Sequence, residues 1–569
     1  MTALDKLRIL HSIIRWRLTW NKRDTHYRFT VPDNPKFMGP RNAVGLIPDG
    51  AVVAFSGLAG NQQATIMYWA TREVYGETRH PRNITAMTVG GMGGRGIVPG
   101  TIEELGQDGL CTRFISGHLE TFKAMLRLAD KGKLELQCLP QGTMSLLFDA
   151  QAHGEDSVLV DTGVGTVFDP RIGRGTPVAG QNAEQLVTVE ENKLRYRIPS
   201  ITVAIFNAPA ADRKGNIYMK HCPMIAEIPE ITSAAKRHNG VVIANVQRIV
   251  DDGYDRIFLT GDLIDAIVLS PPTDAKARMR ATIWESVPSA DSDLTLQEKY
   301  ERLRFANSVL GVTPRRTRVE DAVARLAAST FADNATTGAT VNIGTGLPEE
   351  VCRNLFEAGL LEDITFFTES GVIGGIPAPG IFFGAAVGPD RMISSAEIFK
   401  EVAASLDVTI LGYLQADSEG NVNSSKRGEG PLNYVGPGGF IDFSMSARMV
   451  IFIGKWMARA TTKVVGNTIE IVTPGKPKFV DKVDEITFSG KEALKSGKKV
   501  FYVTDVGLFR LTERGMELSR VMPGIDIQNE IIAFSPMKVV LPASGGVPLV
   551  DDAVVTGKGF SLDLKNGPA

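Results

Sequence analysis

The residue with the clearest capacity for chemistry is Glu369, which opens the glycine-rich stretch ESGVIGGIPAPGIFFG. It comes directly after residues 364–368, an apolar run typical of a strand. Five glycines and two prolines follow it, so backbone can approach a large ligand closely there. Open α/β sheets bind their ligands at the carboxyl ends of strands. A single acid in this position indicates a nucleophile or a general base, whereas an isolated surface glutamate would simply begin a turn.

The distribution of histidine narrows this chemistry. All seven histidines lie at or before His238, and the last 331 residues contain none. Chemistry near Glu369 is therefore not driven by a histidine from the same half of the chain. This disfavours a Ser-His-Asp hydrolase or a histidine-based dehydrogenase built within that half. A carboxylate needs no such base, because it is already ionised near neutral pH.

A second candidate group is the amide of Gln141, in the segment LPQGT that follows the strand-like residues 134–138. An amide at a strand end can donate to a developing oxyanion without ionising. Taken alone, Gln141 would be read as an ordinary surface residue. Whether Gln141 can act as an oxyanion donor depends on which residues the fold places beside it.

Three glycine-rich turns are candidate ligand-binding segments, and each is compared with a different kind of ligand site. Residues 342–349 follow a strand pattern and precede a helical one, so free N–H groups there could bind a phosphate or a pantetheine amide. Residues 435–442 lie between two strand patterns and could offer N–H donors to an oxyanion, although a plain loop is the simpler interpretation. Residues 90–96 show only a loose GxGxxG spacing and do not predict a dinucleotide site.

The elements that must position these groups alternate along the chain. Short β-branched runs, such as residues 241–245, alternate with helical patterns, which predicts an α/β fold with largely parallel sheets. Residues 49–57 are echoed by residues 337–346, and an Ala-Asp-x-x-Gly-Asn turn at 211–216 is echoed at 416–421. Two matches in the same order indicate a duplicated α/β domain.

This repeat divides the chain into four parts. We expect a basic N-terminal arm over residues 1–41 and a first domain over 42–272. A polar linker of helical pattern at 273–315, which contains Pro288, leads to a second domain over 316–569 that carries Glu369.

Composition excludes several classes of protein. Hydrophobic content of 43%, charged content of 22% and a net charge of −2 are typical of a globular protein and give no sign of a nucleic-acid partner. No apolar run reaches the length of a membrane span. The four cysteines are scattered, which argues against a disulfide framework or a zinc ribbon; we expect no metal site and a reducing, cytoplasmic location. They are Cys111, Cys138, Cys222 and Cys352.

The N-terminal arm stands apart from the rest. Residues 1–41 carry nine Lys and Arg residues against three Asp residues, together with Trp16 and Trp20. Charges interrupt every apolar stretch, so this is no secretory signal. A membrane-surface helix or a transit peptide is an alternative, but an arm packed on its own domain or on a neighbouring subunit is favoured.

Together these segments resemble the class I CoA-transferases, in the fused-chain acetate/propionate group. The similarity runs from about Phe37 to about Leu564. It rests on an ordered set of motifs, of which none is decisive alone. The matching segments are the nucleophile motif Glu369-Ser-Gly371, the motif Pro140-Gln-Gly142, and the glycine-rich residues 342–349 and 436–442.

The resemblance implies a fold, an activity and a site. It implies two related open-sheet α/β domains and an acyl-CoA:carboxylate CoA-transferase for acids such as acetate and propionate. The reaction would pass through a glutamyl-CoA thioester on Glu369. Coenzyme A would be a substrate and product with no tightly bound cofactor, and the chain would form a homodimer or homotetramer. Gln141 and the backbone N–H of Gly439 would be oxyanion donors, and coenzyme A would bind at Gly344, Thr345, Gly346, Leu347, Gly374, Gly375 and Gly438.

Three other functions stay open at this point. An acyl-CoA hydrolase would use the same Glu369 with water as acceptor, a non-catalytic module would bind coenzyme A without a covalent adduct, and a sugar-phosphate isomerase would share the general α/β architecture.

The sequence departs from the family pattern in two places. Residues 401–407 replace a glycine-rich stretch, which leaves the shape of the acyl pocket open, and the arm before Phe37 is longer than usual.

Overall fold

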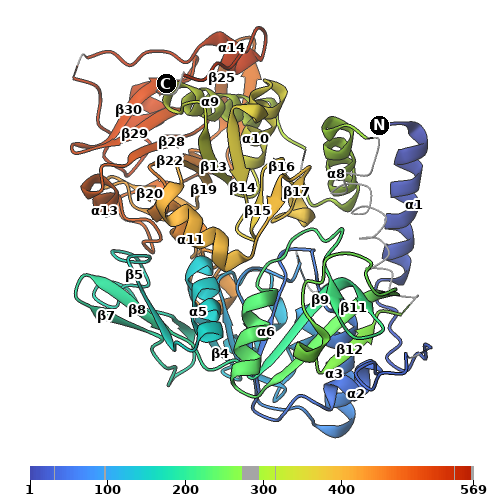
Figure 1. The fold of residues 1–569 in the computed structure, drawn as a ribbon. Helices are drawn as coiled ribbons and strands as arrows, with labels where there is room; N and C mark the ends of the chain where they lie inside the picture. The colour runs from blue at the N-terminus through green and yellow to red at the C-terminus, as the bar shows by residue number, and fades with distance from the viewer. Residues whose placement is uncertain are drawn as a thin grey trace.

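The structure is a computed structural model that describes residues 1–30, 32–94, 96, 98–271, 294–313, 315–543 and 545–565 (Figure 1). The chain forms two halves, each built on an open, mostly parallel sheet with helices packed on it. The predicted α/β class with two related sheets is therefore confirmed. Buried apolar side chains from both halves form one continuous cluster, so the halves pack closely against each other.

The first sheet is parallel except at its edges. Strand β1 lies between β9 and β2, so the order of the strands reverses at β1. At one edge β6 runs antiparallel to β4, and the two-residue β10 runs antiparallel to β9. In spatial order the strands are β12 (Ala266–Leu269), β11 (Val241–Val250), β9 (Val203–Asp212), β1 (Val52–Phe55), β2 (Ile84–Thr88), β3 (Cys111–Ser116), β4 (Glu135–Cys138) and β6 (Pro177–Ala179), with β10 (Ile217–Tyr218) beside β9.

Helices connect these strands, and a small antiparallel sheet extends from the same half (Figure 1). Helix α5 contacts α6, and both lie on the side of the half that meets the second half. The helices are α2 (Pro40–Val44), α3 (Thr65–Thr78), α4 (Lys123–Asp130), α5 (Gln141–His153) and α6 (Ile228–Arg237), with the short η1 (Ile102–Leu105) and η2 (Gly261–Leu263); the small sheet is β5 (Ser157–Val160), β8 (Lys193–Arg197) and β7 (Val187–Glu190).

The second sheet repeats this plan with a parallel centre of five strands. Its order reverses at β13, which lies between β14 and β19. The central strand β22 is buried along its whole length, which is typical of a sheet covered on both faces. In spatial order the strands are β18 (Arg391–Met392), β15 (Val372–Ile373), β14 (Ile364–Phe367), β13 (Ala339–Ile343), β19 (Val408–Gly412), β22 (Met449–Ile453), β28 (Lys499–Val503), β29 (Gly507–Thr512) and β30 (Gly515–Val521).

Helices also pack on this second sheet, and short antiparallel pairs surround it. The helices are α9 (Arg318–Asn334), α10 (Pro348–Glu357), α11 (Ser395–Ser405), α12 (Phe440–Ser446), α13 (Gly490–Lys495) and α14 (Asp552–Thr556), with η3 (Leu360–Glu362), η4 (Gly380–Phe382), η5 (Pro431–Asn433) and the π-helical turn η6 (Ile527–Ile532). The remaining strands are β16 (Ile376–Pro377), β17 (Ala386–Val387), β20 (Gln415–Asp417), β21 (Val422–Asn423), β23 (Met457–Ala458), β24 (Thr461–Val465), β25 (Thr468–Thr473), β26 (Lys476–Pro477) and β27 (Phe479–Val480).

The two Ala-Asp-x-x-Gly-Asn turns have the same structure in both halves. The carboxylate of Asp212 accepts hydrogen bonds from the N–H groups of Lys214 (2.9 Å) and Asn216 (3.0 Å). The carboxylate of Asp417 accepts the equivalent bonds from Glu419 (3.1 Å) and Asn421 (3.0 Å). Each turn joins an antiparallel pair of strands, so the sequence repeat corresponds to a repeated structural unit.

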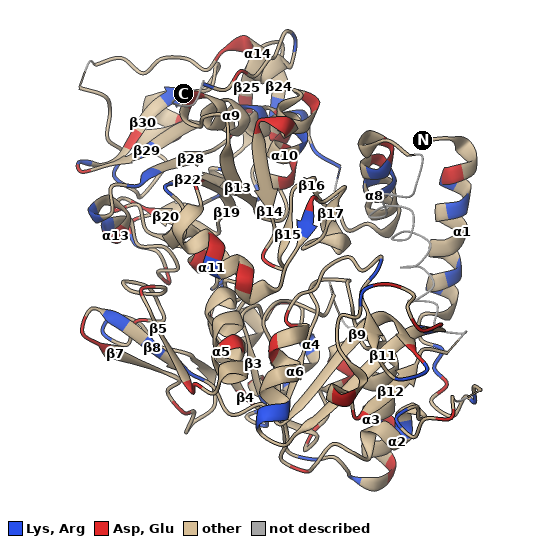
Figure 2. Cartoon of the chain, viewed as in Figure 1, with Lys and Arg blue, Asp and Glu red and all other residues tan. Residues whose placement is uncertain are grey.

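The N-terminal arm packs on the described part of the predicted linker. Helix α1 (Ala3–Thr19) lies beside α8 (Leu296–Leu310), and both helices carry acidic and basic residues (Figure 2). Asp5 pairs with Arg302 at 2.7 Å. Pro288 and the rest of residues 272–293 lie outside the described residues. Among the helices that are described, none combines the length and apolar character needed to cross a membrane.

Candidate active site

Glu369 lies at the carboxyl edge of the second sheet, two residues after β14 ends. Its side chain is only 5% exposed. The turn after it is tight: Gly371 donates its N–H to the carbonyl of Thr368 at 3.1 Å and has a φ of 86°. A Cβ at Gly371 would overlap the carbonyl oxygen of Ile393, so this position requires glycine. The sequence-predicted acid is thus a buried group on a rigid turn.

Burial changes the acidity of this side chain. Desolvation raises the pKa of Glu369 to about 7, and a second buried carboxyl group, Glu227, adds to the rise. The expectation from the sequence that this group is fully ionised near neutral pH is therefore wrong: it is partly protonated there, because burial disfavours the charged form. When ionised, it is a stronger nucleophile than an exposed carboxylate.

Gln141 lies at the carboxyl edge of the first sheet, at the start of helix α5 and just after β4. It is 3% exposed, and its backbone N–H donates to the carbonyl of Gly438 in the second half at 3.0 Å. Its side-chain amide occupies a space that glycines leave open. The amide nitrogen lies 3.3 Å from where a Cβ of Gly90 would be, and the amide oxygen lies 3.6 Å from the same point on Gly438.

Residues 436–439, here called the 436–439 loop, dock on the first half. Gly438 donates its N–H to the carbonyl of Gly117 at 2.8 Å, and Leu119 donates to the carbonyl of Val435 at 2.7 Å. Gly117 follows β3, so the loop covers the carboxyl edge of the first sheet. Gly439 ends the loop as the N-cap of α12. The structure therefore brings Gln141, Gly438 and Gly439 together across the boundary between the halves.

Asp442 of the second half forms hydrogen bonds to the start of helix α5 in the first half. Its carboxylate accepts hydrogen bonds from the N–H groups of Gly142 (2.9 Å) and Thr143 (3.1 Å), at the first turn of α5. A cap that usually comes from the same chain segment is here supplied from about 300 residues away. Burial raises the pKa of Asp442 to about 7.

The residues on either side of Glu369 connect it to the boundary between the halves. The hydroxyl groups of Thr368 and Ser370 both donate to the carbonyl of Gly384. A Cβ on Gly384 would lie 2.5 Å from a methyl carbon of Leu58, which follows β1 in the first half. Leu58 also packs against Gly90, beside the Gln141 amide. One apolar side chain of the first half thus lies between the surroundings of Glu369 and those of Gln141.

Six of the seven predicted coenzyme A-binding residues lie in two turns of the second half, and the seventh, Gly438, lies in the 436–439 loop. Gly344, Thr345, Gly346 and Leu347 form the turn after β13, at the same edge as Glu369, although the Gly346 N–H donates to Glu349 at 3.1 Å. Gly374 and Gly375 have φ values of 79° and 67° and shape the turn between β15 and β16. A Cβ on Gly374 would overlap the carboxylate of Asp390, so local structure already accounts for that glycine.

Residues 401–407 do not lie at this edge. They form the end of α11 and lead into β19, which begins at Val408 and runs parallel to β13. They are therefore at the amino edge of the second sheet, whereas Glu369 is at the carboxyl edge. Asp407 there accepts a hydrogen bond from the N–H of Thr340 at 3.0 Å. This departure from the family pattern is a feature of the far edge of the sheet.

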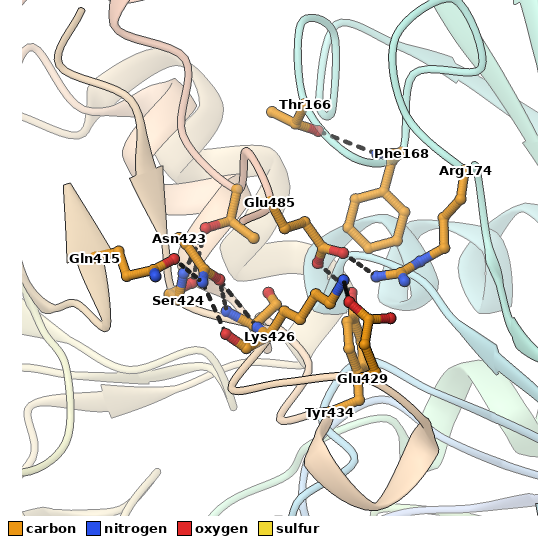
Figure 3. Close-up of polar contacts among 12 residues, drawn as sticks. Thr166, Phe168, Arg174, Gln415, Asn423, Ser424, Lys426, Glu429, Tyr434 and Glu485 are labelled. Atoms are coloured by element: carbon orange, nitrogen blue, oxygen red, sulfur yellow. Dashed lines mark hydrogen bonds and ion pairs between the residues drawn. The ribbon is translucent and has the colours of Figure 1, made fainter. Parts of the chain in front are cut away.

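The sequence did not predict a cluster of polar contacts between the halves, formed by Arg174, Tyr434 and Glu485, just before the 436–439 loop. Figure 3 shows Arg174 of the first half pointing toward Glu485 and Tyr434 of the second. The Tyr434 hydroxyl donates to Glu485 at 2.8 Å, and the Arg174 guanidinium lies 4.4 Å from the Tyr434 ring centre. No motif signals this cluster, because Tyr434 and Glu485 are 51 residues apart and Arg174 is 311 residues from Glu485.

Comparison with known proteins identifies the family. A caffeate CoA-transferase of Acetobacterium woodii is 31% identical over 547 residues, which cover 94% of this chain and 99% of that protein. The chain belongs to the class I CoA-transferases. Acetate CoA-transferase YdiF of Escherichia coli (strain K12) is 28% identical over 511 residues, covering 87% of this chain and 91% of that protein, which places this CoA-transferase with the acetate type.

Solved structures agree with this assignment. A crystal structure of acyl-CoA transferase YdiF from E. coli O157:H7, in a thioester complex with CoA, has a TM-score of 0.79 and 26% identity, covering 94% of this chain and 98% of that one. A Pseudomonas malonate decarboxylase hetero-tetramer shares the fold, with a TM-score of 0.52, 15% identity and coverage of 90% and 85%. The family profile described as "Malonate decarboxylase, alpha subunit, transporter" matches residues 186–281. This protein is an enzyme that transfers coenzyme A.

Proposed function

We propose that this CoA-transferase works through a covalent glutamyl-CoA thioester on Glu369 and moves coenzyme A between short-chain carboxylic acids such as acetate and propionate. The observation that carries the proposal is the position of Glu369. It is a buried carboxyl group on a tight turn at the carboxyl edge of the second sheet, where the two halves meet. The acetate CoA-transferases among its relatives support the choice of short-chain acids.

The proposed reaction needs no separate base. A carboxylate oxygen of Glu369 attacks the thioester carbonyl of an acyl-CoA, the C–S bond breaks, and an acyl-glutamyl anhydride and CoA thiolate result. The thiolate then attacks the glutamyl carbonyl, which breaks the anhydride C–O bond and releases the free acid. An acceptor carboxylate runs the same steps in reverse. The acyl group stays activated throughout, because thioester and anhydride are both reactive acyl derivatives.

Each tetrahedral intermediate carries an oxyanion that needs hydrogen-bond donors. We assign these to the Gln141 amide and the Gly439 N–H, which belong to the arrangement between the helix start of α5 and the 436–439 loop. The turn of residues 344–347 and Gly438 would hold the pantetheine and phosphate groups of coenzyme A along bare backbone, since the N–H groups of Gly346 and Gly438 are already bonded within the protein. Gly374 and Gly375 would shape the adjoining turn. Binding energy from these remote groups can stabilise the closed site and exclude water.

Trapping the covalent intermediate tests this proposal. Purified enzyme is mixed with acetyl-CoA or propionyl-CoA without acceptor acid, treated with borohydride, and digested for peptide mass spectrometry. We expect reduction at Glu369, lost when acetate is added before the borohydride. Turnover without any acceptor would instead indicate a hydrolase, and coenzyme A binding with neither turnover nor adduct would indicate a non-catalytic module. Either result would overturn the proposal.

A further inference from the structure

Glu227 is a buried carboxyl group that the reaction above leaves without a role. It is 2% exposed and is the N-cap of helix α6 in the first half. Its backbone N–H donates to the hydroxyl oxygen of Ser56 at 3.2 Å. Ser56 follows β1, the strand at which the order of the first sheet reverses. Glu227 therefore occupies the part of the first sheet where open α/β folds bind ligands.

One line of contacts joins Glu227 to the turn that carries Glu369. Gly371 of that turn accepts a hydrogen bond from the N–H of Ile393 at 2.8 Å. Two residues further on, Ser395 donates its N–H to the carbonyl of Ala226 at 2.9 Å and its hydroxyl to Glu227 at 2.7 Å. The contact spans the boundary between the halves, since Ser395 belongs to α11.

A second line of contacts reaches the same turn from its other side. The carbonyl of Gly384 accepts hydrogen bonds from both neighbours of Glu369, as described above. A Cβ at Gly384 would lie 3.2 Å from the terminal methyl of Met224, three residues before Glu227. Residues 224–227 thus contact two segments that are bonded to the Glu369 turn: the Met224 side chain lies beside Gly384, and the Ala226 carbonyl accepts from Ser395. This places the two buried carboxyl groups in one region, close enough for the charge of Glu227 to raise the pKa of Glu369.

The surroundings of Glu227 suit a carboxyl group that gains and loses a proton. Its hydrogen-bond partners include the hydroxyls of Ser56 (3.3 Å) and Ser395 (2.7 Å), and a hydroxyl can donate to a carboxylate or accept from a carboxylic acid. The nearby charged groups are mostly acidic. Glu369 of the second half is near enough for the charge of Glu227 to raise its pKa, and Glu230 lies one turn along α6 and accepts from Ser394. Beyond Glu230, Asp149 of α5 is paired with Lys400 of α11 at 2.5 Å, and the Glu397 carboxylate accepts from the N–H of Ser394, the N-cap of α11.

We propose that Glu227 is the second carboxyl group of the active site: it stays protonated while Glu369 is ionised and thereby keeps the site at a single negative charge during catalysis. Glu227 acts on the reaction through Glu369 and is a positioning residue in that sense. The inference deepens the proposed function and rests on Glu369 being the nucleophile.

The physical reason is the cost of two charges in a buried space. Burial raises the pKa of Glu369 and of Glu227 to about 7 each, and the charge of Glu227 raises the pKa of Glu369. Two such carboxyls lose their protons in two steps that belong to the pair. With both protons bound, Glu369 cannot attack. With both lost, a second negative charge lies beside the oxyanion of each tetrahedral intermediate and opposes its formation.

This arrangement predicts a bell-shaped dependence of kcat/KM on pH. The rate should rise as the pair loses its first proton and fall about tenfold per pH unit once it has lost the second. Glu227→Gln removes the second ionisation, so kcat/KM should rise with pH and then stay level. Propionyl-CoA with acetate is the substrate pair to use, because acetate is fully ionised across the range from pH 6 to 9.

Two further variants separate this role from a merely structural one. Glu230→Gln is the matched control, since Glu230 lies on the same helix and is also bonded to a serine of α11. It should keep the bell shape. Ser395→Ala removes a hydrogen bond that lowers the pKa of Glu227, so the alkaline fall should move to higher pH. This variant also serves if Glu227→Gln does not fold.

The outcomes are distinct from those of the adduct experiment. A wild-type profile without the alkaline fall, or a Glu227→Gln profile that keeps it, overturns the role of Glu227. An unmoved alkaline fall in Ser395→Ala does the same. The trapped adduct at Glu369 should form in wild type and in Glu227→Gln alike, so its absence from the wild type would count against the proposed function itself.

Discussion

The two halves of this CoA-transferase have the same architecture and contribute different chemistry. Each sheet reverses its strand order at its first strand, β1 or β13, and each half contains the same aspartate-centred turn. In the second half, the strand beside β13 is followed by Glu369. In the first half, the strand beside β1 is followed by Gly90, against which the Gln141 amide packs.

This difference shows where function resides in a duplicated fold. The strands and their packing are shared, whereas the residues just beyond the carboxyl edges are not. The second half supplies the carboxyl group proposed as nucleophile, and the first half supplies an amide donor and the carboxyl group of Glu227. A site of this kind exists only when the halves are joined. Changes at equivalent places in the two halves should therefore have unequal effects.

The largest effect should come from the second half. We expect Glu369→Ala to lower turnover by at least about 10⁴-fold, because no other group can form the covalent intermediate. Glu369→Asp should be badly impaired, since its carboxylate is retracted by one methylene. Turnover and thermal denaturation measured on the same samples would check this. Glu362→Ala, at an exposed acid just before β14, is the control and should behave as wild type. Normal turnover in Glu369→Ala would remove it from the site.

The first-half donor should matter less. Gln141→Ala should lower kcat by about 10- to 1000-fold, as for other oxyanion donors, because the tetrahedral intermediate loses one of two proposed hydrogen bonds. Steady-state kinetics with propionyl-CoA and acetate would measure it. Gln151→Ala changes a buried glutamine of the same helix, bonded to backbone near residue 198, and should cost stability with little change in kcat. Equal kcat values for the two variants would refute the assignment of Gln141.

The cap between the halves should have a smaller effect on rate. Asp442→Asn keeps one acceptor oxygen for the first turn of α5, so we expect a loss of about 1 kcal/mol in stability and up to about tenfold in kcat. Asp551→Asn weakens an equivalent cap on α14, away from the site, and should lower stability alone. Should both variants lose the same fraction of kcat, Asp442 would have no special role in placing Gln141.

The smallest effect concerns stability at the contact between the halves. Burial raises the pKa of Glu230 to about 8, and one of its oxygens has no hydrogen-bond partner among the described residues. The folded state then binds more protons than the unfolded state between pH 4.5 and 8, so stability falls as pH rises through that window. Glu230→Gln should remove part of this fall and raise Tm by about 1–3 °C at pH 8, but not at pH 5. Tm is measured from pH 5 to pH 8 for both proteins. The same difference in Tm between the two proteins at every pH would contradict the prediction.

Much of the fold was predictable from local patterns. Buried parallel strands read as apolar runs, and the repeated turn depends on an aspartate, a glycine and an asparagine at fixed spacing. The site residues were predictable in part, because Glu369 and Gln141 each follow a strand. Glu227, Asp442 and Arg174 were not, since each acts on a partner in the other half and no spacing along the chain records that contact.

The sequence by itself determined which chemical groups stand at the strand ends, because a motif such as Glu369-Ser-Gly371 is local and its turn requires glycine. Only the tertiary structure decided their acidity and their partners. The pKa of a carboxyl group depends on how completely water is removed and on which charges lie nearby, and both follow from packing the halves together. Within the second half, the path from α11 into β19 set residues 401–407 at the amino edge of their sheet, where their unusual sequence does not border Glu369.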